Sequence, residues 1–462
     1  MKTIQRFPYF PIQFNKAGQA FDAAEESALT QHIAAAGTTD LLVISHGWNN
    51  DWAEAEALYE EFLTNADIAI GKDAPPGLGT RRFAVLGVLW PSKKFADKEL
   101  IPSGAAGIGG AVPSDELIEK LNLLADAFDA PDSAGRIARL KALVPRLEDS
   151  SSACREFAEE ARKLVSGTGA GSGTGTGSGT GSGTGSGSSA AVEDGSATFL
   201  SMDAAEIFDR MSQPVSFDSP APSGGDGGVG GGGAAGIGIN EGGAAGIGSF
   251  LSGALSGARN ILNYTTYYQM KERAGRVGAG GVNPMLRRIQ ADKPGLRLHL
   301  VGHSFGGRLV AATAAEGGIK VSSLSLLQAA FSHYGLSADW DGRGNAGAFR
   351  NVFAGGIVSG PAVVTCTVND KAVGVAYPLA SLLAGQTAAG LGDKDSIYGG
   401  IGRNGAQKTS EAVDTVMNPA GTAYTLQKGK LYNLNADRFV KDHGDVRNPN
   451  VVFAVLSAVA SS

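Results

Sequence analysis

Ten consecutive residues, Leu298-His299-Leu300-Val301-Gly302-His303-Ser304-Phe305-Gly306-Gly307, decide the fold expected of this 462-residue chain. The first four form a mainly apolar run, which is typical of a strand buried on both faces. Small residues that favour a helix extend from Gly306 to about Ala315. Ser304 lies between the two, and it is the only serine of the chain with a glycine two places away on each side. The stretch therefore predicts a strand, a tight turn that carries Ser304, and a helix.

The turn around Ser304 has the properties of a nucleophile elbow. Side chains at positions 302 and 306 would collide in so tight a turn, which explains the glycine at both. The turn lifts the serine above the edge of the sheet, at the amino end of a helix, where developing negative charge is favoured. A glycine-rich turn without chemistry is the alternative interpretation.

Strands and helices are expected to alternate on both sides of this stretch. Asp51 and Glu54 form a capping box at the start of one helix, and Asn448 and Pro449 mark the start of the last helix. The apolar runs that predict strands span 41–44, 83–90, 296–301, 321–330, 361–368 and 431–436. This alternation predicts an α/β fold, a mostly parallel sheet with helices on both faces. Ligands of such sheets bind at the carboxyl ends of the strands.

An unusual composition marks the middle of the chain, from about 92 to 258. Residues 166–189 are almost entirely glycine, serine and threonine, which is typical of a flexible linker, and 223–248 are again rich in glycine. We therefore predict a core made of 1–91 and 259–462, and a largely helical, cap-like insertion over 92–258. A membrane-active role of the glycine-rich stretches is the alternative.

Amphipathic helices are expected within the insertion. One is predicted over 114–128, and more over 134–165, interrupted near Pro145. The apolar face of the first consists of Leu117, Leu121, Leu124 and Phe128. Such faces must be buried. Because an insertion that follows a strand ending at Trp90 emerges at the catalytic edge of the sheet, we expect a helical cap over Ser304.

Charge and cysteine content exclude several classes of protein. The chain has 39 Lys and Arg against 45 Asp and Glu, with no basic tract, which argues against a nucleic-acid partner. Cys154 and Cys366 are too few for a disulfide framework or a four-thiolate zinc site. No apolar run reaches the ~18–20 residues of a membrane span, and none follows the early positive charges as in a signal peptide. We therefore expect a cytoplasmic protein without an integral membrane span; no oligomeric state is predicted.

A serine nucleophile needs a neighbouring base, and His443 is the candidate. It follows the last predicted strand and precedes the last helix, so its loop should lie at the same sheet edge as Ser304. His333 is the second candidate, and a solvated loop histidine is the alternative for His443. A metal site that combines His443 with Asp442 and Asp445 is less favoured, because no second histidine is spaced to join it.

The base in turn needs a carboxylate that orients it, and Asp370 is the candidate. It ends the strand predicted over 361–368, which points it at the catalytic edge; capping of a following helix is the alternative. The order Ser304, Asp370, His443 is that of the hydrolase sheet rather than of the two protease arrangements.

Two backbone N–H groups are needed to stabilise the oxyanion. One is expected from Phe305, directly after the nucleophile. The other is expected from the loop Ser45-His46-Gly47-Trp48-Asn49-Asn50, with the amide of Trp48 favoured over that of Gly47.

Taken together, these motifs resemble the α/β-hydrolase superfamily. The resemblance rests on His46-Gly47-Trp48, Gly302-His303-Ser304-Phe305-Gly306, Asp370 and His443, and it covers about 40–91 and 259–460. Bacterial members that share the His-Gly-Trp loop and a Trp-Pro-Ser segment, here Trp90-Pro91-Ser92, are the most similar. The resemblance implies hydrolysis of a small-molecule or lipid ester through an acyl-enzyme, in a serine esterase or lipase-like enzyme with no metal and no organic cofactor.

Substrate contacts are expected from residues beside these motifs. His46 and His303 adjoin the oxyanion loop and the nucleophile. Tyr264, Tyr267 and Tyr268 recur at helical spacing and are candidates to line the contact between cap and core; ordinary core packing is the alternative for them.

Other functions remain as alternatives at this stage. One is a non-catalytic hydrolase-fold scaffold whose insertion binds a partner or a membrane surface, and another is an exported antibacterial lipase-type effector. Residues 400–405 match the dinucleotide fingerprint letter by letter, but a loop rather than a strand is predicted before them, so we do not expect NAD binding.

Overall fold

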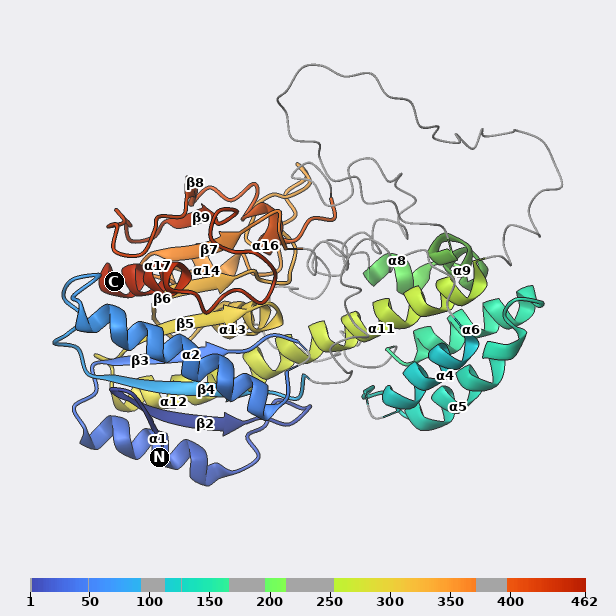
Figure 1. Cartoon of the computed structure of the whole chain (residues 1–462), viewed down its shortest axis with the longest axis horizontal. Coiled ribbons are helices and arrows are strands. Elements are labelled where there is room, and N and C mark those ends of the chain that lie inside the picture. The colour runs from blue at the N-terminus through green and yellow to red at the C-terminus, as the bar shows by residue number, and fades with distance from the viewer. Residues whose placement is uncertain are drawn as a thin grey trace, which may run out of the picture.

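The computed structural model describes residues 2–48, 50–92, 113–125, 127–165, 196–212, 253–370 and 397–462 (Figure 1). Within them, nine strands form one sheet in the order β1-β2-β4-β3-β5-β6-β7-β9-β8. Every neighbouring pair is parallel except β1 with β2. The strands are β1 Lys2–Ile4, β2 Phe7–Gln13, β3 Asp40–Ser45, β4 Phe83–Leu89, β5 Arg297–His303, β6 Val321–Leu327, β7 Ala362–Cys366, β8 Ala412–Val416 and β9 Leu431–Asn435. The expected α/β architecture with a mostly parallel sheet is confirmed.

Helices cover both faces of the sheet. They are α1 Ala23–Ala35, α2 Trp52–Gly71, α11 Ala254–Val277, α12 Asn283–Asp292, α13 Phe305–Ala315, α14 Asn351–Ala354, α16 Ile401–Asn404 and α17 Pro449–Ala460, with the π turn η2 over Gly278–Val282. Alternate residues of β3 belong to different cores: Val43 packs in the cluster that includes α1 and α13, and Ile44 in the cluster that includes α2 and α17. A strand whose successive side chains both meet apolar helices must be apolar throughout, as 41–44 are.

Helix boundaries follow the local signals. The Asp51 carboxylate accepts from the amide of Glu54 while the Glu54 carboxylate accepts from the amide of Asp51, so the expected capping box is present. The Asn448 side chain accepts from two amides of the first turn of α17, with Pro449 next.

Three strands were not expected from the sequence: β1, β2 and β8. β2 contains two prolines, at positions 8 and 11, which weaken its strand signal. β8 is an edge strand and largely exposed, so it lacks the apolar run of an interior strand. The strand expected over 321–330 ends at Leu327, because Gln328 takes a positive φ of 41°.

A helical bundle extends beyond one edge of the sheet (Figure 1). Its helices are α4 Ser114–Leu123, α5 Ser133–Leu143, α6 Ser151–Lys163, α8 Ser196–Ser201 and α9 Ala204–Ser212, with the 3-10 turn η1 at Val144–Arg146. The four apolar residues expected on one helix face, 117, 121, 124 and 128, are buried, although α4 ends at Leu123. Pro145 interrupts the helices where expected. The glycine-rich stretches 166–189 and 223–248 lie outside the described residues.

One long helix joins the bundle to the sheet. α11 packs against α6 and α9 with its first half and against α13 with its second half, and its 24 residues span about 36 Å. The buried guanidinium of Arg273 donates to the backbone oxygen of Pro91, where the chain leaves β4, and to the carboxylate of Asp129 after α4. The bundle is therefore attached at the carboxyl end of β4.

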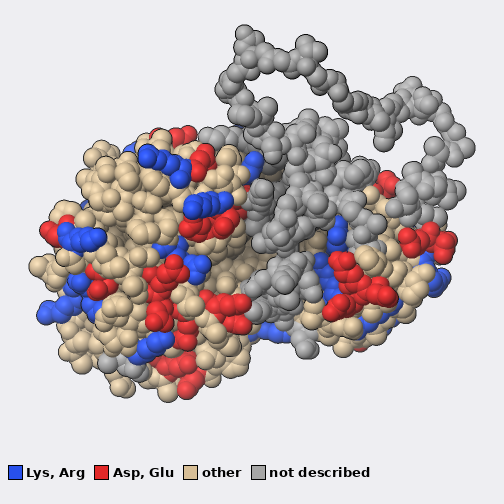
Figure 2. Space-filling model, viewed as in Figure 1, with Lys and Arg blue, Asp and Glu red and all other residues tan. Residues whose placement is uncertain are grey.

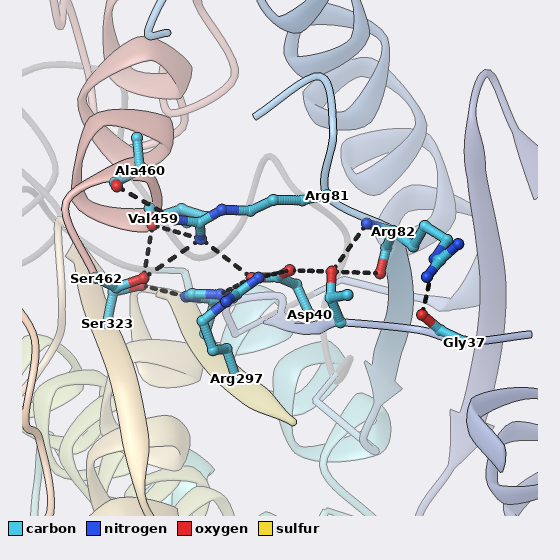
Figure 3. A network of polar contacts seen from close by, with 11 residues as sticks. Gly37, Asp40, Arg81, Arg82, Arg297, Ser323, Val459, Ala460 and Ser462 are labelled. Atoms are coloured by element: carbon cyan, nitrogen blue, oxygen red, sulfur yellow. Dashed lines mark hydrogen bonds and ion pairs between the residues drawn. The ribbon is translucent and has the colours of Figure 1, made fainter. Parts of the chain in front are cut away.

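A buried ion network holds the opposite, amino edge of the sheet (Figure 3). Asp40, the first residue of β3, is fully buried and accepts from Arg297 at 2.7 and 2.6 Å, from Arg81 at 3.1 Å and from His299 at 2.9 Å. Arg81 also donates to the carbonyl of Val459 in the last turn of α17. Through the Asp40 carboxylate, the network links β3, β5, the loop before β4 and the C-terminal helix α17.

The surface charge is mixed. On the face seen in Figure 2, basic and acidic side chains of the described residues are interspersed over the core and the bundle. In the part of the chain that the structure describes, no helix is long and apolar enough to cross a membrane.

Candidate active site

Ser304 occupies a strained turn at the carboxyl end of β5. Its φ of 56° and ψ of −123° lie in a region that side-chain-bearing residues rarely adopt, and it is the residue directly before α13. A Cβ at Gly302 would lie 2.2 Å from the carbonyl oxygen of Gly306, and one at Gly306 would lie 2.3 Å from that of Ser45. The two flanking glycines are therefore required by close backbone contacts, within the turn at Gly302 and with the end of β3 at Gly306 rather than between the two positions.

The neighbouring strand β6 holds this turn in place. The amide of Ser304 donates to the carbonyl of Leu327 at 3.0 Å, and its carbonyl accepts from the amides of Gly307 and Ala330, each at 3.0 Å. Ser304 is 5% exposed. Its backbone is thus held by hydrogen bonds with three residues, and these contacts sustain the unusual φ.

His443 and Asp370 lie together at the same edge. The Nδ1 nitrogen of His443 is 2.8 Å from Oδ2 of Asp370, whose side chain is fully buried, while 19% of the His443 side chain is exposed. His443 is also next to the elbow, because its ring centroid lies 4.8 Å from that of His303. Within the described residues, Oγ of Ser304 makes no hydrogen bond. In structures without substrate, catalytic hydrogen bonds are often long and shorten only in the complex.

The loops that carry Asp370 and His443 are tied to each other. Asp437, just after β9, accepts from the hydroxyl of Thr367 at 2.8 Å and from the amide of Val368 at 2.9 Å. The side-chain amide of Asn369 donates to the carbonyls of Asp437 and Val440 at 3.0 and 2.8 Å. These contacts fix the distance between the residues preceding Asp370 and those preceding His443.

The electrostatics of the pair favour a basic imidazole. Burial lowers the pKa of His443, but the negative charge of Asp370 and the hydrogen bond to it act in the opposite direction, with a smaller contribution from Asp442. The net result is a pKa above the usual 6.5. Since Nδ1 faces the carboxylate, Nε2 is the nitrogen left to exchange a proton.

The loop that follows β3 lies against Ser304. A Cβ at Gly47 would lie 2.8 Å from Cβ of Ser304. The indole of Trp48 packs on the ring of Phe305 with the centroids 5.8 Å apart. Within the described residues, the amides of Trp48 and Phe305 donate to no protein acceptor. The structure thus brings together the three residues expected to form the oxyanion hole.

His46 supports this loop from beneath. It is 1% exposed, and its Nδ1 donates to the carbonyl of Gly47 at 2.9 Å while its Nε2 accepts from the amide of Trp90. Burial lowers its pKa to about 4, so the ring is neutral. Both nitrogens have protein partners in the loop and in the residue after β4, and a substrate contact of His46 stays a prediction.

His303 is likewise turned toward the protein. Its ring is 8% exposed, and its Nε2 donates to the backbone carbonyl of His443 at 2.8 Å. The contact with His443 occupies Nε2 only, so a substrate contact of His303 stays a prediction.

The three tyrosines of α11 are buried in the core. Tyr264 packs on Phe199 of the bundle, with centroids 5.0 Å apart, and Tyr267 packs on Phe305 at 5.1 Å. Tyr268 lies farther along, with Lys271 over its ring. Core packing accounts for Tyr264 and Tyr268, and Tyr267 is the tyrosine that adjoins the residue after the nucleophile.

The second candidate base and the metal alternative have no support from the geometry. His333 is fully buried, with Nδ1 3.1 Å from the side-chain nitrogen of Asn404. In the described ranges, no group of three or more His, Cys, Asp and Glu side chains is arranged to hold a metal ion.

Sequence reasoning missed the residues that fix the loops of Asp370 and His443. Asn369 and Asp437 are small polar residues directly after strands, which is a common pattern in turns and singles out neither. Their partners lie in each other's loops, so the signal appears only once β7 and β9 are known to be adjacent.

No family model matches the chain, and neither does any curated protein or solved structure. The geometry of the site is therefore the basis for assigning a function.

Proposed function

We propose that the protein is a serine hydrolase that cleaves a carboxylic ester through an acyl-enzyme on Ser304. The observation that carries the proposal is the strained turn at Ser304 in combination with the His443–Asp370 pair beside it. A φ of 56° at a serine costs free energy and is retained where surrounding contacts impose it, which is common at active sites.

His443 is the general base in this mechanism. Its Nε2 takes the proton of the Ser304 hydroxyl as Oγ attacks the ester carbonyl carbon, and the imidazolium that forms is stabilised by Asp370. The tetrahedral intermediate then breaks its bond to the alcohol oxygen, which receives the proton from His443. A water molecule repeats both steps on the acyl-enzyme, which releases the carboxylic acid and restores Ser304.

The amides of Trp48 and Phe305 stabilise the oxyanion. Both lie beside Ser304, and both lack a protein acceptor within the described residues. Preorganised N–H donors of this kind contribute roughly 3–4 kcal/mol each to transition-state stabilisation in acyl transfer.

The order of the strands supports an α/β-hydrolase fold with an insertion after β4. The nucleophile follows β5, in the middle of the sheet, the acid follows β7 and the base follows β9, which is the neighbour of β7. The bundle is attached where the chain leaves β4, in keeping with a cap over the catalytic edge.

An apolar acyl or alcohol group is the favoured substrate. The rings of Trp48 and Tyr267 each pack on that of Phe305, the residue directly after Ser304. Hydrocarbon placed against such rings gains about 25 cal/mol per Å² of apolar surface removed from water.

Labelling by a fluorophosphonate probe tests the proposal. The probe reacts with an activated serine, so the intact protein is expected to be labelled at Ser304, as located by peptide mass spectrometry, and the Ser304→Ala variant to remain unlabelled. Ser332→Ala is the matched control, because Ser332 is also a buried serine of the described core and should leave labelling intact. A folded protein that resists the probe, and turns over none of a series of p-nitrophenyl esters, would instead be the non-catalytic scaffold.

A further inference from the structure

His303 contacts all three segments of the candidate active site. It precedes Ser304 in the elbow, its Nε2 lies 2.8 Å from the carbonyl oxygen of His443, and its Nδ1 would lie 3.1 Å from a Cβ placed on Gly47. Its ring also packs beside that of His443, with centroids 4.8 Å apart. The His303 side chain therefore lies between the elbow, the loop of the base and the oxyanion loop, and contacts all three.

The hydrogen-bond partners determine the tautomer of His303. A carbonyl oxygen only accepts, so Nε2 of His303 carries the proton and Nδ1 carries the lone pair. In the described residues, Nδ1 has no hydrogen-bond partner. Burial, and then the neighbouring His443, lower the pKa of His303 to about 3, so the ring stays neutral when His443 becomes an imidazolium.

The main chain at His443 needs such a support. Within the loop from Lys441 to Val446, Asp442 accepts from the amide of Gly444 and Asp445 accepts from that of Lys441. The end of the loop is held by the buried side chain of Val446 and by Asn448, which donates to the carbonyl of Asp445. At His443 itself, Asp370 contacts the imidazole at Nδ1. In the described residues, the hydrogen bond at the His443 carbonyl comes from His303.

We infer that His303 is a positioning residue that holds the backbone of His443 so that Nε2 of the base points at Ser304. This inference rests on the function proposed above and deepens it. His303 holds the backbone carbonyl of His443, and Asp370 holds Nδ1 of its ring. Together the two hydrogen bonds define the direction of the imidazole.

Two variants of matched size separate the hydrogen bond from the packing. His303→Gln places an N–H donor at about the same distance from Cα as Nε2 of histidine, whereas His303→Met fills a similar volume without a donor. We expect His303→Met to lower kcat roughly 10- to 100-fold with KM changed less than threefold, because a misplaced catalytic group costs about that factor. His303→Gln is expected to retain at least a third of kcat. Thermal unfolding of both variants reports whether the fold is preserved.

A second measurement does not depend on turnover. Titration of the His443 imidazole, followed by NMR, is expected to give a pKa above 6.5 in the intact protein and in His303→Gln, and a pKa closer to 6.5 in His303→Met, since a loosened loop weakens the contact with Asp370. Equal kcat and equal His443 pKa values in a folded His303→Met protein would overturn the inference. If the intact protein is inactive and unlabelled, the proposed function fails, while the NMR titration still decides whether His303 positions His443.

Discussion

Nδ1 of His443 and Oδ2 of Asp370 lie 2.8 Å apart, although 73 residues separate them in the sequence. The two side chains meet because β7 and β9 are neighbours in the sheet and both loops leave it at the same edge. The loop contacts of Asn369 and Asp437 then hold the loops together. A buried carboxylate is thus directed at the imidazole of His443, whose side chain is 19% exposed.

Replacement of Asp370 by Asn should impair the base. The amide removes the negative charge that raises the pKa of His443, so this pKa falls toward or below 6.5. Ester turnover is expected to fall roughly 10³- to 10⁴-fold, because the wrong tautomer of His443 is favoured. The pH dependence of kcat/KM measures the effect: activity rises as His443 loses its proton, so the acid limb moves to lower pH in the variant.

Asp442→Asn is the control for this prediction. Asp442 raises the pKa of His443 through its charge only, so its removal should shift the acid limb slightly and leave kcat within a few-fold of the original.

The raised pKa of His443 also affects the stability of the protein. The contribution of His443 to stability is complete below pH 6.5 and is lost as the pH rises through its folded-state pKa.

Removal of the strain at Ser304 should stabilise the protein. Glycine adopts a φ of 56° without a steric cost, whereas alanine keeps the strain of the serine. The Ser304→Gly variant is expected to be about 1–2 kcal/mol more stable than Ser304→Ala, and both to be inactive. Chemical denaturation of the two variants measures the difference, and equal stabilities would show that the turn is not strained.

An added methyl group at Gly47 should damage the oxyanion loop. Its Cβ would lie 2.8 Å from Cβ of Ser304, closer than carbon atoms approach, so the loop must move away from the nucleophile. We expect Gly47→Ala to lower kcat by about tenfold or more, with little change in thermal stability. Gly79→Ala is the matched control, because a Cβ at Gly79 meets no atom within 4 Å. Unchanged kcat in Gly47→Ala would remove this loop from the mechanism.

Loss of the Asp40 carboxylate should destabilise the whole sheet. Asp40→Asn leaves Arg81 and Arg297 without their buried partner, and removal of one member of a buried ion network costs about 3–5 kcal/mol. Glu61→Gln breaks an exposed pair with Arg447 and should cost less than about 1 kcal/mol. Urea denaturation compares the two, and a loss at Asp40→Asn no larger than that at Glu61→Gln would contradict the prediction.

The same network has a defined pH dependence. Burial raises the pKa of Asp40, but hydrogen bonds from Arg297 and His299 outweigh it and bring the pKa far below the usual 3.8. A carboxylate whose pKa is lowered on folding contributes stability above its unfolded-state pKa and loses it as the pH falls. The difference in stability between the intact protein and Asp40→Asn is therefore expected to shrink below about pH 4.

The sequence by itself determined the local parts of this structure. The alternation of apolar runs with capped helices predicted the parallel sheet, because burial on both faces demands apolar residues at every position of an interior strand. The glycines at 302 and 306 predicted the turn at Ser304, and for Gly302 the reason is local, because its Cβ would meet the backbone of Gly306. For Gly306 the reason is tertiary, because its Cβ would meet the backbone of Ser45 and His46 at the end of β3. Where strands lack these signals, as in the exposed β8 and the proline-bearing β2, sequence reasoning failed.

Only the tertiary structure decided which polar groups meet. His46 and His303 both adjoin catalytic motifs in the sequence, which suggested substrate contacts, and only the fold shows that one contacts Gly47 and Trp90 and the other the backbone of His443. A hydrogen bond is directional and extends about 3 Å, so its partner depends on strand order and loop position rather than on neighbours in the chain. A buried apolar side chain can pack against many different partners, so its burial can be predicted from the sequence pattern. A hydrogen bond requires one particular partner, so it can be identified only from the tertiary structure.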